Sequence, residues 1–201
     1  MMDPEIAAWR RRQRTTLLGR REAMPLEARQ DAAQSVAARL SAHVAASRYS
    51  SIGLYWPIKH EINLLSWAQA LARQSGIVLC LPVVVERKAP LEYWRWQQGE
   101  PLGRGIWDIP IPAARDVVLP DLMLAPLVGF DRANYRLGYG GGYFDRTLAS
   151  LARRPMVIGI GYEFGAQDSI FPQPHDIPMD AVMTEQRCTL PQEGGNHDTG
   201  P

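Results

Sequence analysis

Short apolar segments alternate with helix-forming segments along the chain, and this alternation constrains the fold more than any other feature. Apolar segments typical of buried strands occupy 77–81, 121–125 and 156–160. Parallel strands that are buried on both faces have such continuous apolar sequences, and helices connect them. The sequence therefore predicts an α/β fold in which a mostly parallel sheet lies between two helical layers. Further strands are predicted at 51–55, 91–96 and 181–184.

The first 47 residues are rich in Ala, Arg, Gln and Leu, which favour helices. Pro25 divides this region into two predicted helices, at 4–23 and 25–46, because proline suits the first position of a helix. The remaining predictions are a helix from a cap at Asn63 to Gln74 with Gly76 as its stop, a helix from the glycine-rich segment described below to Arg154, and an ordered loop over 97–120.

The length of 201 residues suits one domain, because domains commonly hold about 100–200 residues. We expect this domain over 1–190, followed by a disordered polar tail at 191–201. The 22 basic and 21 acidic side chains give a net charge of +1, which argues against wholesale attraction to nucleic acid or membranes.

Membrane insertion, secretion and metal or disulfide scaffolds are also disfavoured by the sequence. The longest apolar stretch, 117–130, contains two prolines and an aspartate and is too short to span a bilayer. The N-terminus lacks the apolar core of a secretory signal. Cys80 and Cys188 are too few for a disulfide scaffold, and the scattered histidines form no zinc motif. A soluble protein of a reducing compartment is predicted.

Glycine occupies four of the five positions from Gly138 to Gly142, between a predicted strand and a predicted helix. Bare backbone N–H groups at the start of a helix can converge on an anion. The segment is neither a P-loop nor the dinucleotide motif, in which Tyr143 would be glycine. A tight turn that needs positive φ is the alternative, but the number of glycines favours an anion site.

Two aspartates are candidate magnesium ligands. Asp145 follows the glycines in the first helical turn, where it either complements the helix dipole or binds Mg²⁺ beside phosphates. A second acid is then needed, and Asp176 is the candidate, although it can equally cap a loop.

Six arginines lie between positions 10 and 21, and Arg10, Arg14 and Arg21 share one side of the predicted helix. Such a face is ordinarily solvated. Cations at i and i+4 repel one another mildly, however, and a polyphosphate bound there would turn this repulsion into attraction.

Three further residues are weaker candidates for binding groups. Glu61 follows a predicted strand and loop, a common place for ligand contacts in α/β sheets, although an exposed surface acid is the alternative. Trp56 and Trp107 lie in loops, where they either hold a flat heterocycle or cover the edge of the core.

The segment from Pro126 to Asp145 resembles the central signature of the 5-formyltetrahydrofolate cyclo-ligase family, a Phe-Asp pair followed by RLGxGxGYYD. Supporting matches in the N-terminal helix, 55–62, 105–110 and 176–184 extend the resemblance over nearly the whole chain except the tail. It implies an ATP- and Mg²⁺-dependent enzyme that converts 5-formyltetrahydrofolate into 5,10-methenyltetrahydrofolate, ADP and phosphate. A phosphorylated formyl group, an iminium phosphate, is the implied intermediate.

The resemblance also implies roles for individual residues. Arg10 departs from the family, which usually has lysine there, and Phe144 replaces a second tyrosine and supplies no hydroxyl. Tyr139 and Gly141 stand where some relatives have Arg and Lys. The implied ATP contacts are Arg10, Arg14, Arg136, Leu137, Gly138, Tyr139, Gly140, Gly141, Gly142, Tyr143 and Phe144; the implied folate contacts are Trp56, Glu61, Trp107, Tyr139, Gly140, Gly141, Gly142 and Tyr143; the implied magnesium ligands are Asp145 and Asp176.

By the same resemblance we expect a cytoplasmic monomer whose partners are ATP and a folate that can carry polyglutamate, without nucleic acid or membrane. Arg14 and Tyr143 are the catalytic candidates, and no residue is assigned to proton transfer. Two alternatives are a phosphosugar isomerase or CoA-transferase-like enzyme with the same fold, and a non-enzymatic RNA-binding domain that uses the N-terminal arginines.

Overall fold

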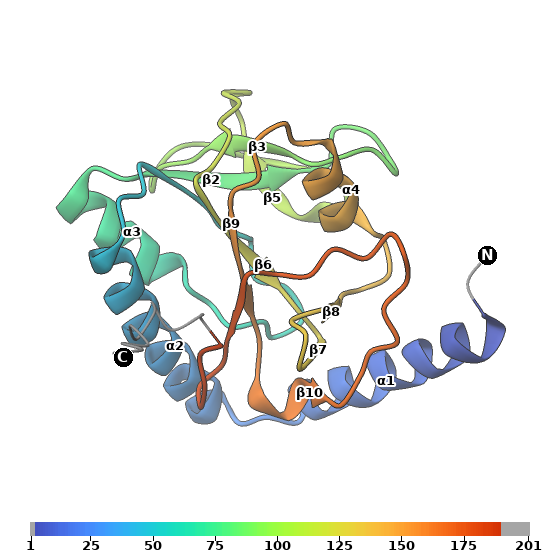
Figure 1. The fold of residues 1–201 in the computed structure, drawn as a ribbon. Helices are drawn as coiled ribbons and strands as arrows, with labels where there is room; N and C mark the ends of the chain where they lie inside the picture. The colour runs from blue at the N-terminus through green and yellow to red at the C-terminus, as the bar shows by residue number, and fades with distance from the viewer. Residues whose placement is uncertain (1–2, 190–201) are drawn as a thin grey trace, which may run out of the picture.

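A sheet of six strands forms the centre of the computed structural model, which describes residues 3–189 (Figure 1). The strand order is β11-β9-β6-β1-β2-β3, and only the pair of β2 and β3 is antiparallel. The predicted mostly parallel sheet is therefore confirmed. The strands are β1 (Ser51–Gly53), β2 (Val78–Val83), β3 (Glu92–Arg95), β6 (Leu122–Pro126), β9 (Met156–Ile160) and β11 (Ala181–Met183).

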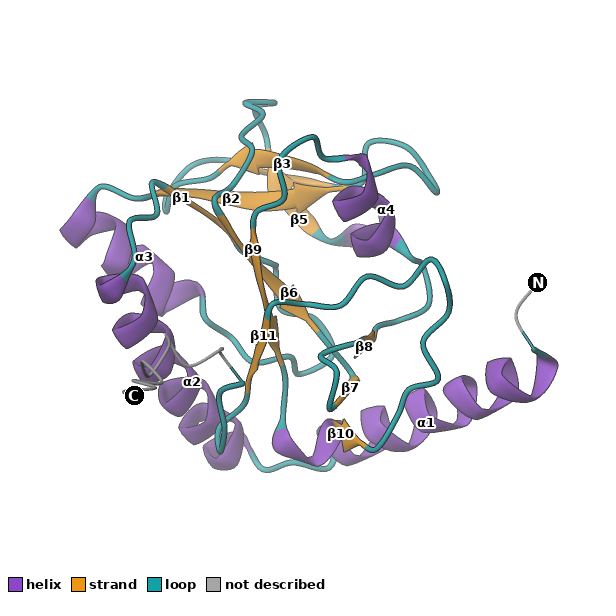
Figure 2. Ribbon diagram, viewed as in Figure 1, coloured by secondary structure: helices purple, strands orange, loops and turns teal. Residues whose placement is uncertain are grey.

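Helices cover both faces of this sheet, as predicted (Figure 2). Successive residues of β6 point to opposite faces: Leu124 packs in a buried cluster with Leu40 of α2, and Met123 in a second cluster with Phe144 of α4. α3 contributes to the first cluster, so α2 and α3 form one layer and α4 belongs to the other. The helices are α1 (Pro4–Glu22), α2 (Leu26–Ala46), α3 (Leu65–Ser75) and α4 (Tyr143–Ser150).

The predicted stop of α3 at Gly76 is confirmed, with φ 72°, whereas the predicted cap and the predicted end of α4 differ from the structure. The N-cap of α3 is Leu64 rather than Asn63, and the Asn63 side chain accepts a hydrogen bond from the Leu65 backbone N–H at 3.1 Å just before the helix. α4 ends at Ser150, before the predicted Arg154. Leu151 has an extended backbone and packs onto the second cluster.

The predicted loop over 97–120 contains a hairpin, so that prediction was incomplete. β4 (Leu102–Arg104) pairs antiparallel with β5 (Pro110–Pro112), and η1 (Ile106–Asp108) forms the tip. Proline is tolerated in β5 because a two-stranded hairpin has only edge strands.

A small sheet, β10-β7-β8, lies beyond the carboxyl ends of β6 and β9. α1 runs along it (Figure 1), and Leu17 of α1 is buried with Val128 and Leu137. This packing places the N-terminal helix beside the glycine-rich segment. The strands are β7 (Gly129–Asp131), β8 (Arg136–Leu137) and β10 (Ala166–Gln167), the last preceded by η2 (Glu163–Gly165).

Within residues 3–189, no helix is long and apolar enough to cross a membrane. The tail at 191–201, predicted to be disordered, lies outside the described residues.

Candidate active site

The glycine-rich loop, Gly138–Gly142, connects β8 to the first turn of α4. Gly140 and Gly142 have φ angles of +93° and +65°, which residues other than glycine rarely adopt. Among residues 3–189, no protein acceptor binds the backbone N–H groups of Gly140, Gly141 or Gly142. These free donors at the start of a helix form the kind of concavity that binds anions.

Arg14 of α1 lies over this loop. Its Nε donates a hydrogen bond of 2.7 Å to the Gly138 carbonyl oxygen. A Cβ atom added at Gly140 would lie 3.5 Å from the Arg14 Cζ. Burial, with a further contribution from Arg10, lowers the pKa of Arg14. Burial and the nearby Arg10 charge both disfavour the protonated form of Arg14. A negatively charged ligand beside Arg14 would therefore offset this cost.

The two predicted magnesium ligands each pair with a buried arginine. Arg10 Nη2 lies 2.5 Å from an Asp176 carboxylate oxygen, and Arg136 Nη2 lies 2.8 Å from an Asp145 oxygen. Asp145 also accepts a hydrogen bond from the Ile177 backbone N–H at 3.2 Å, which places it beside the Asp176 segment. Burial lowers the pKa of Arg136, and both carboxylates oppose this shift.

This acidic pair is a small donor set for a metal. No cluster of three or more His, Cys, Asp or Glu side chains that could hold a metal occurs in the described part of the chain. Magnesium, however, commonly takes only one or two protein carboxylates and completes its shell with phosphate oxygens and water. Asp145 and Asp176 fit that requirement. Each carboxylate would bind the metal while it remains paired with its arginine, Arg136 or Arg10.

A buried polar chain lies beside the loop. Glu61 is only 8% exposed, so the alternative interpretation as an exposed surface acid is wrong. Its carboxylate accepts hydrogen bonds from the Ile58 backbone N–H at 3.0 Å and the Tyr139 hydroxyl at 2.9 Å. Arg21 in turn donates to the Tyr139 hydroxyl oxygen at 3.2 Å. Burial raises the pKa of Glu61, and these hydrogen bonds and charges oppose the rise.

Two aromatic rings meet at the C-terminal end of the loop, where Tyr143 begins α4. Trp107 at the hairpin tip is 58% exposed, and its ring meets Tyr143 edge-on with centroids 5.6 Å apart. Arg146 covers the same tyrosine ring at 4.9 Å and donates to the Gly141 carbonyl oxygen at 2.6 Å. An exposed ring at a hairpin tip next to Tyr143 can cover a flat ligand.

Three predicted contact residues are mainly packing residues. Leu137 is buried with Leu17 and Val128 and can offer a ligand only its backbone. Phe144 is buried in the second cluster, with the Arg136 guanidinium 4.9 Å from its ring centroid. Trp56 packs edge-on against Trp96, with centroids 6.3 Å apart.

The sequence places Arg21 on the arginine face but assigns it no contact at the site, and it misses Lys59 and Arg146 as neighbours of the site. Lys59 Nζ lies 5.3 Å from the centroid of the Tyr139 ring. The helical spacing of Arg10, Arg14 and Arg21 was a usable signal, because the same face is turned inward: Arg10 and Arg21 are buried. No pattern in the sequence marked Lys59 or Arg146.

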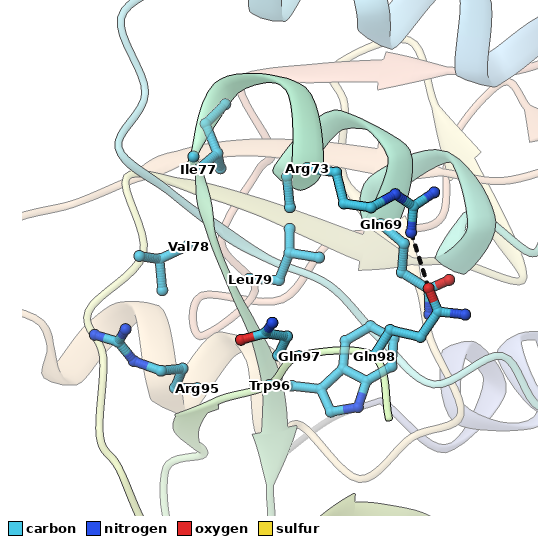
Figure 3. Close-up of a pocket in the computed structure, with 11 residues that line it drawn as sticks. Gln69, Arg73, Ile77, Val78, Leu79, Arg95, Trp96, Gln97 and Gln98 are labelled. Carbon is cyan, nitrogen blue, oxygen red and sulfur yellow. Dashed lines mark hydrogen bonds between the residues drawn. The ribbon is translucent and has the colours of Figure 1, made fainter. Parts of the chain in front are cut away.

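A separate cavity of about 360 Å³ lies between α3 and the amino end of β2 (Figure 3). Arg73 and Gln98 on its rim share a hydrogen bond of 2.9 Å. None of the predicted site residues lines this cavity, so it is distinct from the glycine-rich loop.

The sequence model of the 5-formyltetrahydrofolate cyclo-ligase family matches residues 6–185. The chain belongs to this family. Cyclo-ligase relatives include those of Mycolicibacterium smegmatis, 30% identical over 182 residues that cover 87% of this chain and 92% of the relative, and of Haemophilus influenzae, 30% identical over 142 residues that cover 66% and 74%. The prediction of a cyclo-ligase enzyme is confirmed.

Solved structures of cyclo-ligase relatives share the fold. The NMR structure of Aquifex aeolicus 5,10-methenyltetrahydrofolate synthetase has a TM-score of 0.79 and 26% identity, and covers 95% of this chain and 99% of its own. The Mycoplasma pneumoniae 5,10-methenyltetrahydrofolate synthetase has a TM-score of 0.73 and 25% identity, and covers 88% and 98%. The predicted α/β architecture is that of the cyclo-ligase family.

Proposed function

We propose that this protein uses ATP and Mg²⁺ to close 5-formyltetrahydrofolate into 5,10-methenyltetrahydrofolate, with release of ADP and phosphate. Family membership supports the cyclo-ligase activity. The dependence on ATP rests on one observation above all: Arg14 lies over a loop whose backbone N–H groups are free.

The proposed reaction needs ATP because the formyl oxygen on N5 is a poor leaving group. Transfer of the γ-phosphoryl group to that oxygen releases ADP and gives an iminium phosphate. N10 then attacks the formyl carbon and loses its proton, the carbon–oxygen bond breaks, and phosphate leaves. Enzymes accelerate phosphoryl transfer mainly by positioning and by charge stabilisation.

The residues around the loop suit those two tasks. The N–H groups of Gly140, Gly141 and Gly142 would bind phosphate oxygens, with Arg14 adding a positive charge above them. Bound magnesium would neutralise phosphate charge, and Asp145 and Asp176 are the residues that would hold it. Arg10 and Arg136 keep these two carboxylates in place by ion pairs.

We assign the folate to the space between Glu61 and the Trp107–Tyr143 pair. An ionised Glu61 offers acceptors to the amine and ring N–H donors of a pterin, and the exposed Trp107 ring can cover the flat heterocycle. Trp56 is the weaker contact, because its ring is packed against Trp96. Arg14 and Tyr143 remain the catalytic candidates, since both adjoin the glycine-rich loop.

Burial of the arginines disfavours the RNA-binding alternative. Arg10 and Arg21 are buried, whereas an RNA-binding helix face would present its cations to solvent. We propose instead a cytoplasmic monomer that binds ATP and 5-formyltetrahydrofolate, with or without polyglutamate. The free thiols Cys80 and Cys188 suit a reducing compartment.

The direct test mixes the protein with MgATP and 5-formyltetrahydrofolate and follows the near-ultraviolet absorbance of the methenyl product together with phosphate release. We expect both signals in equal amounts, and neither when ATP or Mg²⁺ is left out. Well-folded protein that forms no methenyl product would contradict the proposal.

Arg14→Met tests whether Arg14 over the glycine-rich loop contributes to ATP binding. We expect KM for ATP to rise about tenfold or more, because a charged hydrogen-bond donor is lost from the phosphate site. Arg12→Met is the matched control, since Arg12 is exposed on the same helix. If both variants had the same KM for ATP, α1 would not be part of the ATP site.

A further inference from the structure

Arg21 is a buried cation at the point where the sheet reverses its strand order. β1 is followed along the chain by β2 on one side and is flanked by β6 on the other. Ligands of open α/β sheets bind at such switch points, beyond the carboxyl ends of the strands. Arg21 Nη2 donates a hydrogen bond of 2.6 Å to the carbonyl oxygen of Leu127, directly after β6. Glu61 lies in the segment after β1, so the hydrogen-bonded series Arg21–Tyr139–Glu61 connects the segments that follow β6 and β1 at this switch point.

The chemistry of these three groups fixes the direction of their hydrogen bonds. A guanidinium can only donate, so the Tyr139 hydroxyl oxygen must accept from Arg21. The single hydroxyl proton of Tyr139 is then available to Glu61, whose carboxylate can only accept while it is ionised. Donation by Arg21 and acceptance by an ionised Glu61 therefore require the same direction: Tyr139 accepts from Arg21 and donates to Glu61.

Arg21 is itself held in place. It is 2% exposed, and its guanidinium lies 5.7 Å from the centroid of the Tyr162 ring. The Tyr162 hydroxyl donates to the His60 carbonyl oxygen at 2.9 Å, which ties this contact to the segment carrying Glu61. Burying a charge this fully costs free energy unless hydrogen bonds and opposite charges replace the lost water.

We propose that Arg21 is a positioning residue for the folate site, which directs the Tyr139 hydroxyl proton to Glu61 and so keeps the Glu61 carboxylate oriented and ionised to accept hydrogen bonds from the pterin. This inference rests on the proposed function. Arg21 acts through Tyr139 and Glu61 and touches neither ATP nor the reacting atoms. It therefore sets the affinity for the folate and leaves the affinity for ATP unchanged.

Arg21→Met removes the charge and keeps the bulk of the side chain. We expect KM for 5-formyltetrahydrofolate to rise about tenfold or more, while KM for ATP changes less than about twofold. Arg21→Lys restores a cationic donor and should recover part of the loss. Arg20→Met is the control, because Arg20 is the exposed neighbour on the same helix and contacts Phe164.

The pH profile separates positioning from general damage to the fold. The groups that face Glu61 are the cations Arg21 and Lys59, the hydroxyls of Tyr139, Tyr55 and Tyr162, and the Ile58 N–H. Loss of the Arg21 charge removes one of the two cations, so the acid limb of kcat/KM for the folate should move to higher pH in Arg21→Met. Arg20→Met should keep the wild-type limb.

Tyr139→Phe covers the case in which Arg21→Met does not fold. This variant removes the hydroxyl that links Arg21 to Glu61 but leaves the buried Arg21 charge in place. We again expect a selective rise in KM for the folate. Unchanged folate KM in both folded variants, or an equal rise in both KM values, would overturn the inference. Wild-type protein without turnover would instead overturn the proposed function and this inference with it.

Discussion

Gly140 has a positive φ and lies under the Arg14 guanidinium, so it tests whether bare backbone at this point is required. Gly140→Ala places a methyl group in the proposed phosphate cradle and strains the backbone by about 1–3 kcal/mol. We expect KM for ATP to rise about tenfold, because the methyl group occupies the space of a phosphate oxygen. Initial rates at varied ATP concentration give this value.

Gly99→Ala is the matched control for backbone strain. Gly99 has φ +89°, close to the +93° of Gly140, but nothing lies within 4 Å of an added Cβ. Both variants should lose similar thermal stability, and only Gly140→Ala should lose ATP affinity. If Gly99→Ala weakened ATP binding as much, strain rather than the cradle would explain the effect.

At the scale of single residues, the sequence predicted the charged and glycine-rich parts of the site but not their partners. The segment from Gly138 to Gly142 and the face with Arg10 and Arg14 were visible as patterns. The pairing of Arg10 with Asp176 was not, because it joins positions 166 residues apart. The burial of Glu61 was also missed, since it depends on Tyr139 packing from a distant segment.

The β4–β5 hairpin is an element with a predicted role, because its tip carries Trp107 above Tyr143. Trp107 and Asp108 both have positive φ, at 61° and 60°, a strained arrangement for residues other than glycine. Trp107→Ala should raise KM for the folate by about twofold to tenfold, as expected for one lost aromatic contact. The wild-type protein should also show a change in tryptophan fluorescence when the folate binds.

Trp107→Phe should abolish most of that fluorescence change. Trp67→Phe is the control, because Trp67 lies on α3 and binds Ser41 through its indole N–H at 2.8 Å. If the Trp67 variant lost the signal and the Trp107 variant kept it, the hairpin would not touch the folate.

The sequence predicted the long and strongly patterned elements best. α1, α2, β6 and β9 appear within a few residues of their expected ends, since proline, glycine and apolar runs mark them. The short strands β7, β8 and β10 were missed, because two or three residues carry no periodicity. They exist only through pairing with one another, which is tertiary information.

Asp121 stabilises the whole molecule by tying the amino ends of β6 and β1. Its carboxylate accepts hydrogen bonds from the Ser50 N–H at 3.0 Å, the Ser50 hydroxyl at 2.5 Å and Arg153 at 2.6 Å. These bonds, that of the Ser50 hydroxyl foremost, hold the pKa of Asp121 well below its usual range. Its contribution to stability is therefore complete above the unfolded pKa of 3.8 and disappears as the pH falls below it.

Asp121→Asn should therefore lower Tm at pH 7 by about 2–4 °C, equivalent to about 1 kcal/mol, and the difference from wild type should shrink below pH 4. Thermal unfolding followed by circular dichroism across this pH range measures it. Asp168→Asn is the control, because the Asp168–Arg132 pair is almost fully exposed. A difference that stays constant down to the acid limit would contradict the assigned cause.

At the scale of the whole molecule, the alternation of strands and helices was sufficient to predict the layers of the fold. It could not give the strand order, because β6 returns to pair with β1 rather than with its predecessor in the sequence, β5. That return creates the switch point at which Arg21, Tyr139 and Glu61 meet. The location of the site therefore follows from topology, whereas its chemistry is visible in the residues.

The dependence of the site on both halves of the chain has a consequence during protein synthesis. Arg14 and its acceptor Gly138 are 124 residues apart, and Arg10 and Asp176 are 166 apart. Because translation proceeds from the amino end, α1 leaves the ribosome well before the segments that it must meet. A nascent chain released before Asp176 thus carries cations without their acidic partner, and the proposed nucleotide site would be complete only when translation is nearly finished.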